Sequence, residues 1–424
     1  MSRMVLPLYQ WRRKMEAIEV NSANEWRTMT PGVEGWSHTA RRSDPNKYFM
    51  VSCDDHANEP PTLWVERMDA KYRERLPRVW VDEHGVQWRQ SEGQQKPDRL
   101  VLAALEGEDA ARAKAGANVE QRLKDLDMDG IDAELVFPNK GLAMWSTPDP
   151  VFASAQCKVY NDWAWETYGS HVDRCSPVAT ISTGDLEGSI VEVQRAAAMG
   201  FRSVNIPCKP IYGPHDVNHV NYNLPHFDPL WAAIEETGMP VTIHISTGKD
   251  PRTSRGPGGA LVNYFAHAFS PVFEPIANLC ASGVLDRFPR LHFSLIETGV
   301  GWIPWMLDTM DEVYKKHHFW VKPKLKHGLP SDYFRRHFSA TFSEDPSGVA
   351  LCETLGLEGN FLWASDYPHH EGTWPHSSEA IERQMGTLRD GTRAQILGLN
   401  AARIFHFPVP PRYQATQAQT GLTQ

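Results

Sequence analysis

Segments with the character of buried β-strands alternate with amphipathic segments over most of this 424-residue chain. Strands are predicted at residues 48–53, 133–137, 178–182, 203–206, 241–245, 292–296, 338–342 and 361–365. Helices are predicted at 118–126, 149–168, 186–199, 228–236, 273–282, 302–314, 347–355 and 380–399. Strands that alternate with helices form parallel sheets through right-handed crossovers. Eight such units therefore predict an α/β fold that closes into a (β/α)8 barrel.

Three segments lie outside this rhythm and set the predicted domain boundaries. Residues 1–47 are polar with several tryptophans, and we expect an N-terminal arm that packs on the barrel or on a second subunit. The barrel is expected to span 48–407, interrupted by an insertion or lid at 57–116 that contains a hairpin. Residues 408–424, rich in Pro, Gln and Thr, are expected to form an extended or disordered C-terminal tail.

Composition and missing motifs exclude several classes of function. The net charge of −9 argues against nucleic acid or an anionic membrane as a partner. No apolar run reaches the ~20 residues that a membrane-spanning helix needs. The chain lacks the glycine-rich signatures of dinucleotide and nucleotide phosphate binding and the G-x-S-x-G nucleophile elbow. These absences argue against nucleotide-dependent oxidoreductases, kinases and serine hydrolases.

Cysteine and tryptophan usage indicates the compartment and the kind of ligand. Six cysteines are widely scattered without a C-x-x-C pair, which predicts free thiols in a reducing cytoplasm. Fifteen tryptophans is a high count, and some are expected to line a pocket for a planar or apolar small molecule. The aromatic residues of the arm favour a homodimer.

In a (β/α)8 barrel, functional side chains sit where the strands end. The first predicted strand is followed by Asp54 and His56, which share one face and can together hold a divalent cation. A solvated acidic turn is the alternative there. His244 ends the fifth strand between β-branched residues, where a purely structural histidine is the alternative. The recurrence of such residues at several strand ends favours a metal site.

Carboxylates also follow the sixth and eighth strands. Asp366 ends the eighth strand and is the strongest candidate, because an Asx-turn does not explain the histidines that follow it, including His369. Glu297 ends the sixth strand and is a candidate ligand, acid–base group or partner of His244, or a carboxylate that only stabilises a helix N-terminus. His267 follows the fifth strand and faces either the substrate or solvent.

These motifs together resemble the amidohydrolase-related group of the amidohydrolase superfamily. The resemblance rests on D-x-H with a following E-P (54–60), on His244, on E-x-G-x-G-W-x-P (297–304), and on S-D-Y-P-H with E-G-x-W-P (365–375). That group includes 2-amino-3-carboxymuconate-6-semialdehyde, γ-resorcylate and 5-carboxyvanillate decarboxylases. The resemblance implies a distorted (β/α)8 TIM barrel that holds one divalent metal ion, Zn²⁺ or Mn²⁺, with iron as a further possibility. By position it implies the metal ligands Asp54, His56, His244 and Asp366.

The resemblance also implies an enzyme. The first expectation is non-oxidative decarboxylation of an aromatic or unsaturated carboxylic acid, with Asp366 moving the proton and His369, His267 and Glu297 assisting. The alternative is metal-dependent hydrolysis of an amide, ester, lactone or C–C bond. A non-heme iron oxygenase on the same scaffold is a third possibility. Glu297 departs from the histidine that many relatives carry at this strand end, so the choice of chemistry depends most on this residue.

Overall fold

Parallel strands form a barrel in the computed structural model, which describes residues 20–94, 97–100, 107, 110–111, 116, 118–210, 221–247, 254–317, 319–321 and 324–413. Their barrel order is β1 (Val51–His56), β5 (Ala133–Phe137), β6 (Cys175–Pro177), β7 (Ala179–Thr180), β8 (Val204–Ile206), β9 (Val241–His244), β10 (Phe293–Ile296), β11 (Phe338–Phe342) and β12 (Phe361–Trp363). β6 and β7 are two parts of one strand, since Val178 between them donates to the Val136 carbonyl (3.1 Å) and Ala179 to the Ser203 carbonyl (3.1 Å). The predicted (β/α)8 barrel is thereby confirmed.

The first and last strands meet through backbone hydrogen bonds at their carboxyl ends. The Asp366 N–H donates to the Asp54 carbonyl (2.9 Å), and the His56 N–H donates to the Tyr367 carbonyl (2.6 Å). Both strands are buried along their length, as expected for parallel strands covered by helices. This contact brings the residues that follow β12 beside those that end β1.

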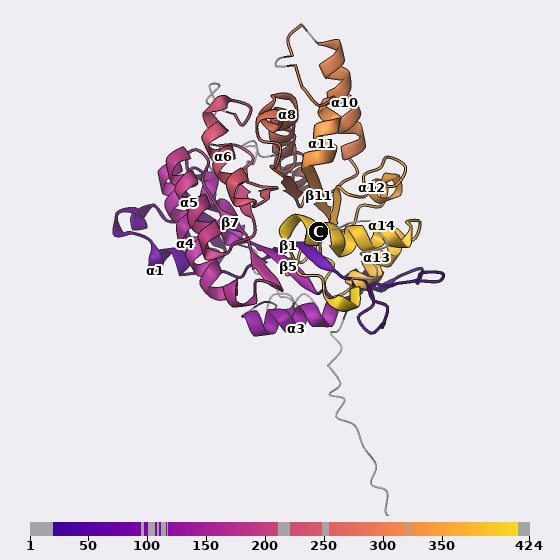
Figure 1. Cartoon of the computed structure of the whole chain (residues 1–424). Coiled ribbons are helices and arrows are strands. Elements are labelled where there is room, and N and C mark those ends of the chain that lie inside the picture. Colours follow the sequence, from indigo (N-terminus) through magenta and orange to yellow (C-terminus); the bar gives the residue numbers. More distant parts are fainter. Residues whose placement is uncertain are drawn as a thin grey trace, which may run out of the picture.

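Helices surround the barrel (Figure 1). The main ones are α3 (Val119–Asp129), α4 (Pro150–Tyr168), α5 (Leu186–Met199), α6 (Asp228–Thr237), α8 (Phe273–Ala281), α10 (Ile303–Lys316), α11 (Pro330–His337), α12 (Pro346–Leu351) and α13 (Ser377–Met385). Their ends follow the expected chemistry: Asp149 caps α4 by accepting from two backbone N–H groups, and Gly238 ends α6 in the left-handed conformation. None of the described helices combines the length and apolar composition needed to cross a membrane.

One predicted helix is wrong. A single helix was expected over 380–399, but α13 ends at Met385 and the chain re-enters helical structure as α14 (Asp390–Ala394), a π-helical turn (Gln395–Leu399) and α15 (Asn400–Phe405). Apolar residues continue through the break, because Leu388 between the two helices is buried in the core. The helical periodicity therefore concealed the interruption.

The insertion after β1 contains a small antiparallel sheet. Short helical segments at α1 (Leu63–Arg67) and Ala70–Arg75 lead into β2 (Arg78–Val81), β3 (Gln87–Gln90) and β4 (Asp98–Leu100). The predicted hairpin is confirmed, because β2 pairs with β3, and β4 adds a third strand. Most of the insertion between 101 and 117 lies outside the described residues.

The described part of the arm, residues 20–47, packs on its own barrel. Arg41 forms a bidentate ion pair with Glu382 of α13 (2.7 and 2.9 Å). Arg27 donates to the carbonyls of His370 (2.9 Å) and Gly372 in the loop after β12. At the other end of the chain, Tyr413 is buried and its hydroxyl donates to Asp132 (3.2 Å). Residues 1–19 of the arm and 414–424 of the tail lie outside the described residues.

Candidate metal centre

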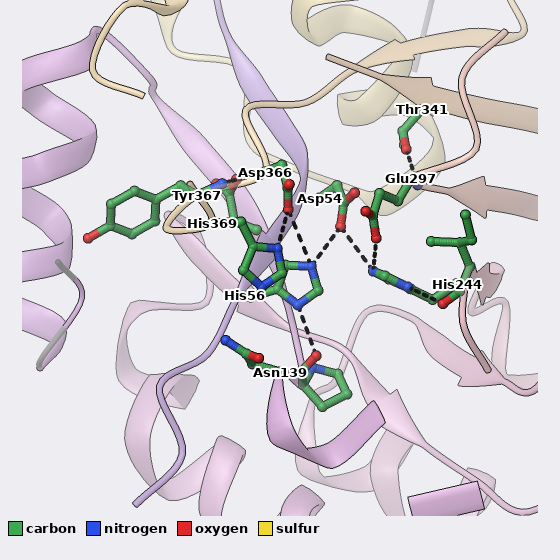
Figure 2. Close-up of polar contacts among 12 residues, drawn as sticks. Asp54, His56, Asn139, His244, Glu297, Thr341, Asp366, Tyr367 and His369 are labelled. Carbon is green, nitrogen blue, oxygen red and sulfur yellow. Dashed lines mark hydrogen bonds and ion pairs between the residues drawn. The ribbon is translucent and has the colours of Figure 1, made fainter. Parts of the chain in front are cut away.

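The side chains of Asp54, His56 and His244 converge at the carboxyl end of the barrel (Figure 2). Asp54 and His56 lie in β1, and His244 ends β9. Asp54 Oδ1 lies 3.4 Å from Nε2 of His56 and 3.3 Å from Nε2 of His244. All three residues are buried. The structure thus brings three of the four predicted metal ligands within contact of one another.

Backbone carbonyls orient both imidazoles toward the Asp54 carboxylate. His56 donates its Nδ1 proton to the Pro138 carbonyl (2.9 Å), and His244 donates its Nδ1 proton to the Ile245 carbonyl (2.7 Å). Nε2 of each ring then faces an oxygen of the Asp54 carboxylate, and an unprotonated Nε2 is an acceptor like that oxygen. Nε2 of His56 is buried without a hydrogen-bond partner. Two acceptor atoms that face each other require a proton or a metal cation between them. This arrangement of imidazole nitrogens and carboxylate oxygens therefore fits a bound metal ion.

Asp366 joins this cluster from the residues that follow β12. Its Oδ1 lies 3.5 Å from Nε2 of His56 and accepts a hydrogen bond from Nδ1 of His369 (2.8 Å). The His369 ring stacks on His56, with ring centroids 4.1 Å apart. Asp366, the fourth predicted ligand, therefore contacts the same His56 ring as Asp54, and His369 contacts Asp366.

Glu297 reaches the cluster from the end of β10. Its Oε2 lies 3.7 Å from Nε2 of His244, and its backbone N–H donates to Thr341 Oγ1 (2.8 Å). The Tyr264 hydroxyl contacts both Glu297 Oε1 (3.2 Å) and Glu371 Oε1 (3.0 Å). Sequence reasoning identified neither Tyr264 nor Glu371 as part of the site, and Glu371 also forms an ion pair with His370 (2.6 Å). Glu371 is the first residue of the E-G-x-W-P motif, and its place in that motif was the signal that could have identified it.

The backbone is in an unusual conformation at both carboxylates that follow strands. Glu297 has a φ of 61° and Asp366 a φ of 57°, in the left-handed region that L-residues other than Gly, Asn and Asp rarely adopt. Such conformations cost of order 1–3 kcal/mol and persist where the surroundings enforce them, which is common at functional sites. Here the left-handed turn accompanies a carboxylate that projects into the cluster.

The electrostatics of the cluster also favour a cation. Burial opposes ionisation of Asp54, but the charges and hydrogen bonds of His244 and His56 hold its pKa below the usual value. Burial lowers the pKa of His56 to about 4, which keeps the ring neutral and able to act as a ligand. Burial and the nearby Asp366 raise the pKa of Glu297 to about 8. Burial alone would lower the pKa of His244, but the Asp54 charge raises it, so the carboxylates of the cluster stabilise positive charge at this place, as a proton or as a divalent ion.

Groups of possible ligands can be defined by distance. Within the described residues, ligand atoms of Asp54, His56, His244 and Glu297 all lie within 4.8 Å of one another. Two further groups meet the same limit: one is His56, Asp366 and His369, and the other is Glu297, Asp366 and Glu371. His267 is in none of these groups. It is buried in a π-helical turn (Asn263–Ala268), where its Nδ1 contacts Asn263 (3.2 Å). Its catalytic role stays a prediction.

Asp55 ties the last strand to the first. It points away from Asp54 and His56, as the alternation along a strand predicts. Its Oδ1 accepts hydrogen bonds from Ser52 Oγ (2.8 Å), Ser365 Oγ (2.6 Å) and the Tyr367 N–H (2.9 Å). One buried carboxylate therefore sets the position of the residues on either side of Asp366.

A buried arginine from α3 supports the same junction. The guanidinium of Arg122 is fully buried, forms a bidentate ion pair with Glu134, and donates to the His56 carbonyl (2.7 Å). It also lies over the Tyr367 ring, 5.0 Å from the centroid. Sequence reasoning missed Arg122, because one arginine in an amphipathic helix gives no sign that it is buried.

Comparison with known proteins defines the class to which this site belongs. Residues 99–407 match the family model described as amidohydrolase, which is well over half of the chain. The chain therefore belongs to the amidohydrolase family, as the strand-end motifs indicated.

Individual relatives are more distant. The chain is 24% identical over 303 residues to a γ-resorcylate decarboxylase of Rhodococcus jostii, covering 67% of this chain and 86% of the relative. Its fold is similar to that of a 5-carboxyvanillate decarboxylase from Sphingomonas paucimobilis, with a TM-score of 0.60, 21% identity, and coverage of 85% of this chain and 100% of the other. A dihydroxybenzoic acid decarboxylase from a Polaromonas species with bound manganese gives a TM-score of 0.57 at 16% identity, over 86% of this chain and 99% of the other.

Proposed function

We propose that this protein is a metal-dependent carboxy-lyase that removes the carboxyl group of an aromatic or unsaturated acid without oxidation. The convergence of Asp54, His56, His244 and Asp366 at the carboxyl end of the barrel carries the proposal. Membership of the amidohydrolase family supports it, and so do relatives named for decarboxylation of aromatic acids.

These four residues would hold one divalent ion, Zn²⁺ or Mn²⁺. Manganese is favoured by its presence in the Polaromonas structure, and both ions accept mixed carboxylate and imidazole ligands. When bound, the ion supplies Lewis acidity and a fixed attachment point for the substrate carboxylate. The donor set of this chain fits such an ion through the lone pairs that His56 and His244 direct at Asp54.

Asp366 is the group that would deliver the proton. Decarboxylation breaks the bond between the carboxyl group and the adjacent carbon, CO₂ leaves, and a proton takes its place on that carbon. His369 holds Asp366 Oδ1 at 2.8 Å and lies nearer the surface, so it can return a proton to this carboxylate after each turnover. Glu297 contacts His244 and would position that ring.

An iron-dependent oxygenase is the second candidate, and one observation favours it. Glu297, Asp366 and Glu371 place three carboxylate oxygens within 4.8 Å of one another, beside the ligands already described. A carboxylate-rich group of this kind could hold a second ion, and carboxylates suit iron and manganese. If a single metal ion is bound, hydrolysis is the alternative to decarboxylation. Asp366 or Glu297 would then be the general base that activates a water molecule.

Gas measurements separate the candidates. Mn²⁺-loaded protein is incubated with a panel of hydroxylated benzoic acids, and headspace CO₂ and dissolved O₂ are followed together. We expect CO₂ release equal to the acid consumed, at an unchanged O₂ concentration. Oxygen uptake coupled to loss of the acid would favour the oxygenase instead.

We also propose a homodimer, formed through α10. This helix lies at the periphery of the molecule (Figure 1) and exposes Trp305, while Trp320 just beyond its end is 77% exposed. Its acidic residues, including Asp308, precede its basic ones, including Lys316, so antiparallel packing on a second copy sets Asp308 opposite Lys316.

Light scattering tests this dimer. At micromolar concentration, the wild-type protein should have twice the 47.9 kDa mass of one chain. Trp305→Glu should give the mass of a single chain, because the dimer would have to bury the new charge in an apolar contact. Glu25→Gln on the arm is the control. A wild-type monomer, or a Trp305→Glu dimer, would contradict the proposed interface.

The cytoplasm is the proposed compartment. All six cysteines are buried free thiols, as predicted, which is the state that a reducing environment maintains. The proposed partner of the site is a small planar acid.

A further inference from the structure

Arg27 lies in a 3-10 helical segment of the N-terminal arm (Ser22–Thr28) and is a buried cation, only 8% exposed. Its guanidinium donates to two backbone carbonyls of the loop after β12, those of His370 (2.9 Å) and Gly372. Within the described residues it forms no ion pair with a carboxylate. Burying a charge is costly unless hydrogen bonds compensate, so these two carbonyls stabilise the cation where it lies.

The two carbonyls belong to the residues on either side of Glu371, in a loop that packs closely on the end of β12. The Thr373 N–H donates to the Ser365 carbonyl (2.7 Å), and the Gly372 N–H donates to the His369 carbonyl (3.2 Å). A Cβ atom at Gly372 would lie 2.5 Å from the Ser365 carbonyl oxygen, so only glycine fits there. A contact that fixes the backbone at 370 and 372 therefore fixes Glu371 relative to the end of the strand.

Glu371 is connected to the metal centre through Tyr264. The Tyr264 hydroxyl contacts Glu371 Oε1 (3.0 Å) and Glu297 Oε1 (3.2 Å), and Glu297 Oε2 lies 3.7 Å from Nε2 of His244. Carboxylate oxygens of Glu371, Glu297 and Asp366 lie within 4.8 Å of one another. Glu371 is itself exposed, so its place depends on the backbone that carries it. A shift of the loop would remove a partner of Tyr264 and a carboxylate from the edge of the centre.

Contacts with α13 hold Arg27 in place. Arg383 of this helix donates to the Arg27 carbonyl (2.7 Å). The guanidinium groups of Arg383 and Arg27 lie over the Trp26 ring, 5.4 and 5.1 Å from its centroid. Farther along the arm, the bidentate ion pair of Arg41 with Glu382 is a second anchor on the same helix (2.7 and 2.9 Å). The arm is therefore fixed to α13 at two places, and at one of them it also contacts the loop that carries Glu371.

We propose that Arg27 is a positioning residue for the reaction at the metal centre. Through its two hydrogen bonds, the N-terminal arm holds Glu371 in contact with Tyr264 at the edge of the centre. The planar guanidinium suits this task, because it can donate to two acceptors at once. The inference rests on the proposed function, since Glu371 affects turnover only if the reaction takes place at this centre.

Hydrogen exchange of the loop tests the contact without requiring turnover. The amides of Gly372 and Thr373 are followed by mass spectrometry in the Mn²⁺-loaded full-length protein. In Arg27→Ala they should exchange about tenfold faster than in the wild-type protein, because a hydrogen bond to a charged group contributes roughly that factor. Arg27→Met, which keeps the apolar part of the side chain, should show the same change. Arg41→Ala is the matched control, because it removes the other anchor of the arm and should leave exchange in the loop unchanged.

Chemical rescue separates positioning from a general loss of stability. Arg27→Ala should release CO₂ with a kcat about tenfold or more below that of the wild-type protein and a KM within about twofold, as expected when a group of the site is misplaced. Guanidinium ion at a non-denaturing concentration can occupy the vacated space and donate to the same two carbonyls. It should therefore restore both kcat and the slow exchange of the loop. Guanidinium otherwise destabilises folded proteins, so it should not rescue a variant that merely unfolds.

Exchange of the loop amides at the wild-type rate in Arg27→Ala would overturn the inference. Faster exchange with an unchanged kcat would do the same, as would an equal loss of kcat in Arg41→Ala. If the wild-type protein releases no CO₂ from the hydroxylated benzoic acids, the decarboxylase is refuted, and the electron paramagnetic resonance spectrum of bound Mn²⁺ decides the inference. Arg27→Ala should then alter that spectrum and guanidinium should restore it, whereas identical spectra in the two proteins would overturn the inference.

Discussion

Asp366→Asn is expected to abolish decarboxylation while the barrel stays folded. The substitution removes the proposed proton donor and one metal-binding oxygen, so the rate of CO₂ release should fall by at least about a thousandfold. Asparagine is the informative replacement, because Asp366 has a φ of 57° and Asn tolerates this region better than most residues. The backbone hydrogen bond from residue 366 to the Asp54 carbonyl (2.9 Å) does not depend on the side chain.

Thermal unfolding and circular dichroism provide the check on folding. The variant should keep the wild-type spectrum and a melting temperature within a few degrees of it. Asp185→Asn is the matched control, since Asp185 caps α5 and Asn caps helices equally well. Turnover by Asp366→Asn at the wild-type rate would remove this residue from the chemistry.

His244→Ala should weaken metal binding more than any substitution outside the cluster. Loss of a residue that only supports a ligand typically costs ten- to a hundredfold in affinity, so loss of the ligand itself should cost at least about a hundredfold. Calorimetric titration with Mn²⁺ measures the change, and His56→Ala should behave alike, because its Nε2 also faces Asp54 (3.4 Å).

A buried histidine elsewhere in the barrel controls for loss of packing. His337 is buried at the end of α11 and its ring contacts the Leu291 carbonyl (3.0 Å), far in sequence from every candidate ligand. His337→Ala should therefore lower stability without changing Mn²⁺ affinity. If His244→Ala bound Mn²⁺ as tightly as the wild-type protein, His244 would not be a ligand.

The barrel and the strand-end residues could be predicted from the sequence because their signals are local. Each buried strand is a short apolar run, and Asp54, His56, His244 and Asp366 directly follow such runs. Parallel strands in a closed barrel place all their carboxyl ends on one face, so the convergence of these residues follows from the topology.

The remaining parts of the site depend on contacts between distant segments. Tyr264 reaches Glu297 and Glu371 from a π-helical turn that has no distinctive pattern. Arg122 is buried against Glu134 and His56, which only the packing of α3 on β1 and β5 determines.

Decarboxylation in D₂O tests the proposed reaction most directly. Mn²⁺-loaded protein, a hydroxylated benzoic acid or benzene dicarboxylic acid, and dissolved oxygen are followed together, with NMR of the product. The proposed function predicts one CO₂ released per acid consumed, one deuterium on the carbon that lost the carboxyl group, and no oxygen uptake. A product that carries a new hydroxyl group, formed with consumption of O₂, would contradict it.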